Sequence, residues 1–253
     1  MSEPYPEVVA RFYDAVYAEV RDGTDNDFYL GRMAAAGGPV LEIGAGTGRL
    51  LREALRREVD AWGIDVSPAM VERCRAQLAP SQRDRVSVAD AVTMRLGHCF
   101  ALIVAPFRVL SHVAPVEDQL RLLDTVHEHL VPGGAFVFDL YVPNLKLLLE
   151  GLGERCDFDG EWTPGRRLRR LVSSDPADLA RQTNHVRMTF VWDEEDGERR
   201  DTWEFDMRFY FRFEIEHLVA RSKLRLAALH GDFAGGPLTA ESRELVVVCR
   251  PPE

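Results

Sequence analysis

The sequence lacks several features that would each point to a particular class of protein. No apolar run approaches 18 residues, so no membrane-spanning helix is expected. Asp and Glu number 41 against 31 Lys and Arg, and the net charge of -10 disfavours nucleic acid and anionic membrane surfaces as partners. Residues 1–7 are acidic and contain proline, unlike a secretory signal. These absences predict a cytoplasmic protein that binds neither nucleic acid nor membrane.

Cysteine is scarce, and its spacing carries no sign of a metal site. The four cysteines form no C-x-x-C pair and have no histidine at ligand spacing; they are Cys74, Cys99, Cys156 and Cys249. We therefore expect reduced thiols packed inside the protein and no bound metal. What the sequence does have is a hydrophobic share of 46%, enough for one sizeable core. We expect a single domain over residues 1–253.

From residue 39 onward, strand-like and helix-like segments alternate, as they do in a parallel α/β sheet. Helices are expected at about 47–58, from Pro68 with Ser67 as its N-cap, and from Val116 to Leu130. A further helix is expected from Ile215 to Ser222. The expected strands cover residues 39–43, 62–65, 86–88, 100–105, 135–140, 224–230 and 245–249.

Between residues 157 and 212 the pattern changes to alternation of period two, which indicates an inserted antiparallel sheet. Asp196-Gly197 lies between two alternating runs and predicts a two-residue hairpin turn. That turn would pair Phe190 with Trp203 and Arg187 with Asp206. The sheet is expected to serve as a lid or as a dimer platform, because the apolar face carrying Trp203, Phe205, Met207 and Phe209 needs cover. A homodimer is one way to supply it.

The basic run Arg166–Arg170 is expected in a third strand of this sheet. We interpret it first as a solvated edge strand, whose positive charge discourages aggregation. The alternative is a patch that attracts an anionic substrate such as a sugar nucleotide.

A glycine-rich turn follows the first expected strand, in the run Val40-Leu-Glu-Ile-Gly-Ala-Gly-Thr-Gly-Arg49. Glycines at 44, 46 and 48 let a ligand approach the backbone at the start of a helix. The dinucleotide fingerprint G-x-G-x-x-G would need glycine where Arg49 stands. A glycine-rich turn alone does not identify its ligand, and this spacing argues against the dinucleotide class.

Two acids follow at the ends of the next strands. Asp65 comes about 20 residues after the turn, where a carboxylate can accept hydrogen bonds from ribose hydroxyls. Asp90 ends the third expected strand and could receive an adenine amino group. Each has a plainer alternative, as a helix-entry or loop aspartate.

Taken together, LEIGAGTGR, GIDVSPAMVERCR, VADA and LVPGGAFVFDLY resemble the class I S-adenosylmethionine-dependent methyltransferase family, over residues 36–141 and the last 40 residues. The resemblance implies a Rossmann-like, doubly wound α/β fold: a seven-stranded sheet, mostly parallel, with an antiparallel last strand. It implies S-adenosylmethionine as the cofactor. By the same resemblance Gly44, Gly46 and Gly48 contact the cofactor, Asp65 its ribose and Asp90 with Ala91 its adenine, while Glu42 orients the turn. Neighbouring positions complete the expected cofactor site: Tyr17, Ala45, Arg49, Val66 and Met70.

Three residues are candidates for catalysis. His112 follows the fourth expected strand and could accept a proton or orient the acceptor; the alternative is a histidine that caps the following turn. Tyr13 lies four residues before Tyr17, on one face of a helix that could fold over the site, or that simply buries aromatic residues. Tyr141, at the end of the fifth expected strand, is the third candidate.

We therefore expect methyl transfer to a small molecule. Residues 12–17 and 108–112, with the antiparallel insertion, resemble more weakly a subgroup that includes glycine, sarcosine and amino-sugar N-methyltransferases, and this resemblance favours an amine nitrogen. The alternatives are an O-methyltransferase, a nicotinamide-dependent oxidoreductase and a non-catalytic protein that binds the cofactor.

Overall fold

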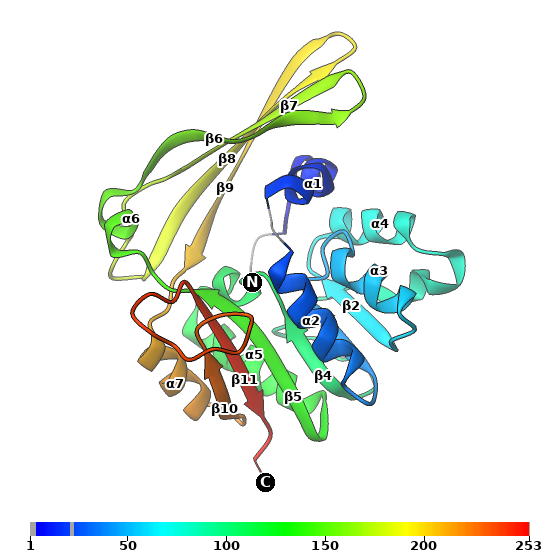
Figure 1. Cartoon of the computed structure of the whole chain (residues 1–253), viewed down its shortest axis with the longest axis vertical. Coiled ribbons are helices and arrows are strands. Elements are labelled where there is room, and N and C mark those ends of the chain that lie inside the picture. The colour runs from blue at the N-terminus through cyan, green and yellow to red at the C-terminus, as the bar shows by residue number, and fades with distance from the viewer. Residues whose placement is uncertain (1–3, 21–22, 253) are drawn as a thin grey trace.

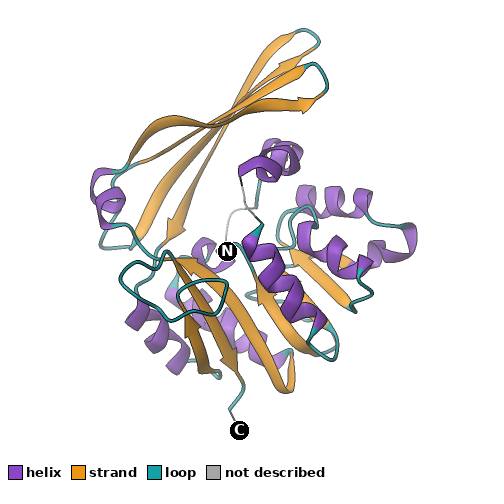
Figure 2. Ribbon diagram, viewed as in Figure 1, coloured by secondary structure: helices purple, strands orange, loops and turns teal. Residues whose placement is uncertain are grey.

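The computed structural model describes residues 4–20 and 23–252, and its core is a seven-stranded mixed sheet (Figures 1 and 2). In spatial order the strands are β10 (Arg225–His230), β11 (Glu244–Arg250), β5 (Leu130–Tyr141), β4 (Phe100–Ala105), β1 (Val40–Ile43), β2 (Ala61–Asp65) and β3 (Val86–Val88). β11 is antiparallel to both of its neighbours, and the strands from β5 to β3 run parallel. The predicted Rossmann-like α/β fold with an antiparallel last strand is confirmed.

Helices cover both faces of this sheet, so its central strands are mostly apolar, with Glu42 of β1 and Asp139 of β5 as buried acids. One face packs against α2 (Thr24–Ala34), α3 (Arg49–Arg56) and α4 (Pro68–Gln77), and the other against α5 (Val116–Glu128) and α7 (Arg212–Ala220). As predicted, Ser67 is the N-cap of α4 and accepts a hydrogen bond from the Met70 N–H. Two short 3-10 turns are also present. η1 (Pro80–Arg85) connects α4 to β3, and η2 (Val109–His112) lies between β4 and α5. No helix within the described residues is long and apolar enough to cross a membrane.

The inserted segment forms a separate four-stranded antiparallel sheet, as predicted (Figure 1). Its strands are β6 (Leu152–Thr163), β7 (Arg166–Ser174), β8 (Thr183–Glu194) and β9 (Gly197–Arg208), and α6 (Leu145–Glu150) leads into it. It therefore occupies residues 152–208, whereas the alternation pattern placed it at 157–212. The start of β6 was not predicted because its side chains are largely exposed and show no apolar alternation. Phe158 is the one buried side chain of this strand.

The register of the β8–β9 hairpin differs from the prediction by two residues. Glu194 pairs with Gly197, so the turn residues are Glu195 and Asp196 rather than Asp196 and Gly197. A shift of two keeps every side chain on its expected face but changes its partner. Arg187 consequently bonds to Glu204, at 2.8 Å, instead of meeting Asp206. Apolar alternation alone could not separate the two registers, since both keep the same residues on the inner face.

The basic run lies in β7, and the edge-strand interpretation is wrong because β7 lies between β6 and β8. Its arginines are already paired across the sheet: Arg167 with Asp159, Arg169 with Glu198, and Arg170 with Asp157. Arg166 pairs with both Glu194 and Glu195. This pairing also leaves the run poorly suited to capture an anionic substrate.

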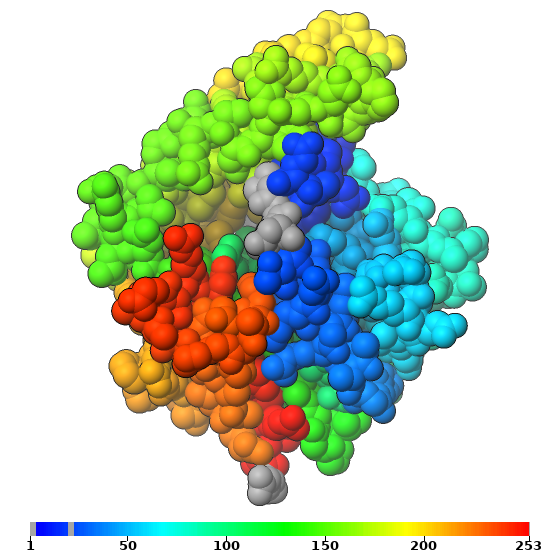
Figure 3. All heavy atoms as spheres, in the orientation of Figure 1, coloured from blue at the N-terminus to red at the C-terminus, as the bar shows by residue number. Residues whose placement is uncertain are grey.

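The apolar face of the inserted sheet is covered by the chain itself. Helix α1 (Glu7–Val20) lies between this sheet and the core, where Figures 1 and 3 show it in blue. Phe12 and Val16 of α1 are fully buried in one cluster with Trp203 and Phe205. The need for cover that suggested a homodimer is thus met within one chain.

The cysteines divide into two pairs. Cys74 and Cys249 are buried, as expected, whereas Cys99 and Cys156 are exposed. Cys156 is exposed because it lies on the outer strand β6. All four are free thiols.

Candidate functional site

A cavity opens at the carboxyl ends of β1, β2, β3 and β4, the edge at which parallel α/β sheets bind ligands. Tyr5 and Tyr13 of the N-terminal segment reach it from the other side. The expected cofactor-site residues that line it are Glu42, Gly44, Ala45, Gly46, Arg49, Asp65, Val66, Met70, Asp90 and Ala91. Of the expected catalytic residues, His112 and Tyr13 line it as well.

The glycine-rich turn and Asp65 form one hydrogen-bonded unit. The Gly46 N–H donates to Asp65 Oδ2 at 2.9 Å, and the Ser67 N–H donates to Oδ1 at 2.8 Å. Gly46 adopts a left-handed conformation with φ of 56°, which favours glycine at this position. Burial raises the pKa of Asp65, and the two backbone hydrogen bonds oppose that rise. Each carboxylate oxygen keeps lone-pair capacity for a ligand hydroxyl.

Glu42 lies beneath this turn, buried in β1. Burial raises its pKa to about 8, with Arg49 opposing the shift and Asp65 adding to it. Its Oε2 is buried and has no hydrogen-bond partner within the described residues. A buried carboxyl oxygen without a partner is costly, so it suits a site that a ligand amino group completes.

Asp90 and Ala91 lie where the chain leaves β3. Asp90 Oδ1 accepts the Val92 N–H at 2.9 Å, which holds the loop in a turn. Both residues line the cavity beside Ala89, Val113 and Leu122. One carboxylate within an apolar slot fits a flat, mostly apolar ring that carries an amino group.

His112 lies at the end of η2, against the aromatic face of β9. Its Nε2 lies 3.2 Å from the Tyr5 hydroxyl, and its ring centroid lies 5.6 Å from that of Phe205. Burial lowers the pKa of His112 to about 4, so the imidazole is neutral at neutral pH. Burial raises the pKa of Tyr5 well above its ordinary value, so its hydroxyl remains protonated.

Three expected site residues lie outside the lining of the cavity. Tyr17 stacks behind Tyr13, with ring centroids 4.4 Å apart. Gly48 is the N-cap of α3 and faces Cys74. Tyr141 lies against the guanidinium of Arg108, which is 5.6 Å from its ring centroid.

Sequence reasoning missed several residues that line this cavity, among them the aromatic residues Tyr5 and Phe107. Tyr5 precedes every helix signal, so nothing in the sequence indicated that it returns to the site. Phe107 and its neighbour Arg108 have φ of 65° and 64°, a left-handed conformation that side chains rarely adopt. Two consecutive residues of this kind cost of order 1–3 kcal/mol each, and such strain concentrates at functional sites.

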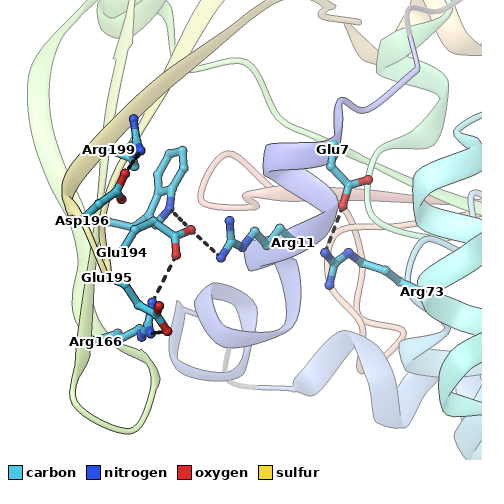
Figure 4. Close-up of polar contacts among 9 residues, drawn as sticks. Glu7, Arg11, Arg73, Arg166, Glu194, Glu195, Asp196 and Arg199 are labelled. Atoms are coloured by element: carbon cyan, nitrogen blue, oxygen red, sulfur yellow. Dashed lines mark hydrogen bonds and ion pairs between the residues drawn. The ribbon is translucent and has the colours of Figure 1, made fainter.

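Helix α1 roofs the cavity and is tied to both halves of the molecule. Arg11 reaches Glu194 of β8 at 2.7 Å, and Glu7 pairs with Arg73 of α4 at 3.0 Å (Figure 4). Asp14 accepts hydrogen bonds from Thr47 of the glycine-rich turn and from Gln77 of α4. The roof is therefore anchored on the inserted sheet and on the ligand-binding turn. No group of three or more His, Cys, Asp or Glu side chains in the described part of the chain could hold a metal ion.

Known proteins similar to this chain agree with the predicted family. Residues 40–134 match the family model of a methyltransferase domain. The carboxy-S-adenosyl-L-methionine synthase of Pseudomonas putida (strain W619) is 34% identical over 116 residues, which cover 42% of this chain and 46% of that protein. The dTDP-3-amino-3,4,6-trideoxy-alpha-D-glucopyranose N,N-dimethyltransferase of Streptomyces venezuelae is 26% identical over 100 residues, covering 40% and 41%. Each match spans less than half of the relative's length.

Among solved structures, an S-adenosylmethionine-dependent methyltransferase from Clostridium acetobutylicum superimposes with a TM-score of 0.76. The superposition covers 97% of this chain and 98% of that one, at 19% sequence identity. It therefore extends over the inserted sheet as well as the core, and it shows that the two chains share a fold.

Proposed function

We propose that the protein is an S-adenosylmethionine-dependent methyltransferase. Two findings support this: residues 40–134 match the methyltransferase domain model, and the chain shares its fold with a methyltransferase of that kind. The observation that supports this most is the placement of Asp65, Asp90 and the glycine-rich turn on one cavity. The residues fit the cofactor: Asp65 for the ribose, Asp90 and Ala91 for the adenine, and the buried Oε2 of Glu42 near the turn for an amino group.

The cofactor, when bound, supplies a methyl group on a positively charged sulfur. Transfer of that methyl group to an acceptor lone pair would disperse the charge. The protein therefore needs to position the acceptor and exclude water. Tyr5, Tyr13 and Phe107 wall the cavity with aromatic side chains that can do both. The neutral imidazole of His112 can orient an acceptor or accept its proton.

We further propose a small-molecule acceptor with an amine nitrogen, on the strength of the sequence similarity to the N,N-dimethyltransferase. A neutral amine needs no strong general base, which suits a histidine whose pKa burial lowers to about 4. A hydroxyl acceptor has to lose a proton, for which such a weak base is poorly matched. Release of S-adenosylhomocysteine, followed over amine and hydroxyl acceptors, tests this choice. Turnover with hydroxyl compounds alone would contradict it.

The name of the Pseudomonas relative raises a second candidate, a reaction that alters the cofactor by adding a carboxyl group to it. A carboxylate-bearing co-substrate calls for an unengaged cation in the cavity. Among the described residues that line the cavity, Arg49 is the one arginine or lysine, and it is engaged by Asp25 and Asn26. We therefore favour methyl transfer. Mass spectrometry of the cofactor after incubation separates the two, since one product is lighter than S-adenosylmethionine and the other heavier.

Calorimetric titration with S-adenosylmethionine is the primary test of the proposal. Native protein should bind, and Asp65→Ala should lose at least about tenfold in affinity, because a hydrogen-bonded charged group contributes 1.5–3 kcal/mol. Asp84→Ala, at an exposed aspartate in η1, is the matched control and should bind as native. Absence of binding by the native protein would overturn the proposal, and titration with nicotinamide dinucleotides would follow.

A further inference from the structure

The turn that follows β4 has a backbone conformation that something must hold in place. Phe107 and Arg108 are both left-handed, and neither is a glycine or an asparagine. Their side chains diverge. Phe107 lines the cavity, whereas Arg108 donates to Glu244 Oε1 of β11 at 3.0 Å. A relaxed turn would move the Phe107 ring, because the strained backbone sets its direction.

Asp139, near the end of the neighbouring strand β5, keeps the turn in this conformation. Its Oδ1 accepts the Phe107 N–H at 2.7 Å and the Tyr29 hydroxyl of α2 at 2.6 Å. Asp139 is 2% exposed and Tyr29 is fully buried. Burial, and then the charge and hydrogen bond of Asp139, raise the pKa of Tyr29 well above its ordinary value, so Tyr29 remains a donor. One buried carboxylate oxygen thus joins α2 to the strained turn.

The position of Phe107 also sets the aromatic wall of the cavity, the row of rings formed by Phe107, Tyr17 and Tyr13. The Phe107 ring meets Tyr17 edge to face at a centroid distance of 5.3 Å, and Tyr17 in turn packs on Tyr13. The guanidinium of Arg49 lies 5.7 Å from the Phe107 centroid, so this ring already has a cation near it. Aromatic faces attract cations that are shielded from water.

We propose that Asp139 is a positioning residue that acts through Phe107. By fixing the Phe107 N–H it holds the aromatic wall in the position that favours a positively charged ligand over its neutral counterpart. The inference rests on the proposed function and deepens it. S-adenosylmethionine carries a sulfonium and S-adenosylhomocysteine a neutral thioether, so this pair of ligands reports the preference directly.

The test is calorimetric titration of both ligands into native protein, Asp139→Ala, Phe107→Ala and the double variant, well below each unfolding temperature. Asp139→Ala and Phe107→Ala should each weaken S-adenosylmethionine roughly tenfold and S-adenosylhomocysteine distinctly less. The double variant should bind no worse than Phe107→Ala, because both changes remove the same contact. Asp139→Asn keeps an acceptor oxygen and should restore binding to within about threefold of native.

Other outcomes contradict the proposal in distinct ways. If Asp139→Ala lowers the unfolding temperature while both affinities stay native, Asp139 is structural only. Additive losses in the double variant would show that Asp139 does not act through Phe107. If Asp139→Ala does not fold, Phe107→Ala is the deciding variant. An unchanged ratio of its affinities for S-adenosylmethionine and S-adenosylhomocysteine would contradict the inference. A native protein that binds neither ligand overturns the proposed function as well.

Discussion

Asp14 of α1 accepts a hydrogen bond from the Thr47 hydroxyl at 2.5 Å, which ties the roof of the cavity to the turn on its floor. Thr47 is buried and Asp14 is exposed, so the contact is partly shielded from water. The same carboxylate accepts the Gln77 side-chain N–H at 2.8 Å on an exposed flank. The helix and the ligand-binding turn are therefore joined by one part-buried hydrogen bond.

We expect Thr47→Val to loosen this roof with little change in shape. Loss of a hydrogen bond to a charged group should speed dissociation of S-adenosylmethionine by roughly three- to tenfold. Stopped-flow displacement measures the rate. Gln77→Ala removes the exposed bond to the same carboxylate and is the control. Equal effects in the two variants would show that the hydrogen bond from Thr47 has no special part in retaining the ligand.

Arg11 should hold α1 against the inserted sheet. Its guanidinium lies 4.5 Å from the Trp162 ring and reaches Glu194 at 2.7 Å. Arg11→Met keeps the apolar stem and removes the charge, so about 1 kcal/mol of stability should be lost. Hydrogen exchange should rise across residues 7–20. Arg73→Met breaks only an exposed pair with Glu7 and should leave exchange unchanged.

Glu42 should make the ligand-free protein less stable as the pH rises. Its folded pKa of about 8 exceeds the ordinary value of 4.5, so the folded state holds a proton that the unfolded state has lost. Stability from this group is complete below pH 4.5 and falls by about 1.4 kcal/mol per pH unit up to about 8. Glu42→Gln should abolish that slope in urea titrations. An identical slope in the variant would contradict a buried neutral carboxyl.

His112 should make the protein less stable as the pH falls. Its folded pKa of about 4 lies below the ordinary 6.5, so stability from the neutral ring is present above pH 6.5 and is lost as the pH falls toward 4. His112→Gln can still bond to Tyr5 and should remove this loss, which acid unfolding curves would reveal. Retention of the full acid sensitivity would assign it to other groups.

Gly48 should matter for folding and Gly46 for binding. A β-carbon on Gly48 would lie 2.5 Å from Cys74 Sγ, whereas one on Gly46 meets nothing within 4 Å. Both have positive φ, so alanine strains either backbone, at about 1–3 kcal/mol. Gly48→Ala should lose more stability than Gly46→Ala, and adding Cys74→Ala should recover the difference. Cofactor affinity should fall mainly in Gly46→Ala. A larger loss of affinity in Gly48→Ala would instead place Gly48 at the ligand.

The core could be predicted because each of its strands carries its own signal. β4 is apolar along its length, and Ser67-Pro68 marks the start of α4 without reference to the rest of the chain. The glycine-rich turn, Asp65 and Asp90 each follow such a strand, so their meeting at one edge follows from parallel topology.

The failures involve contacts that depend on distant segments. The hairpin register was ambiguous because both alternatives bury the same face, and the observed one pairs Arg187 with Glu204. Likewise, nothing local to Tyr5 or Phe107 indicated their place in the cavity. Tyr5 reaches the site through the path of the N-terminal segment, and Phe107 through a hydrogen bond to the buried Asp139.

The inserted sheet leaves the core after β5 and rejoins it before α7, while β5 pairs directly with β11. The excursion thus interrupts no pairing of the seven-stranded sheet. Substitutions within it can accumulate without disturbing the strands that carry Asp65 and Asp90. Such an arrangement lets the inserted sheet vary during descent while the pairing of the seven core strands is kept.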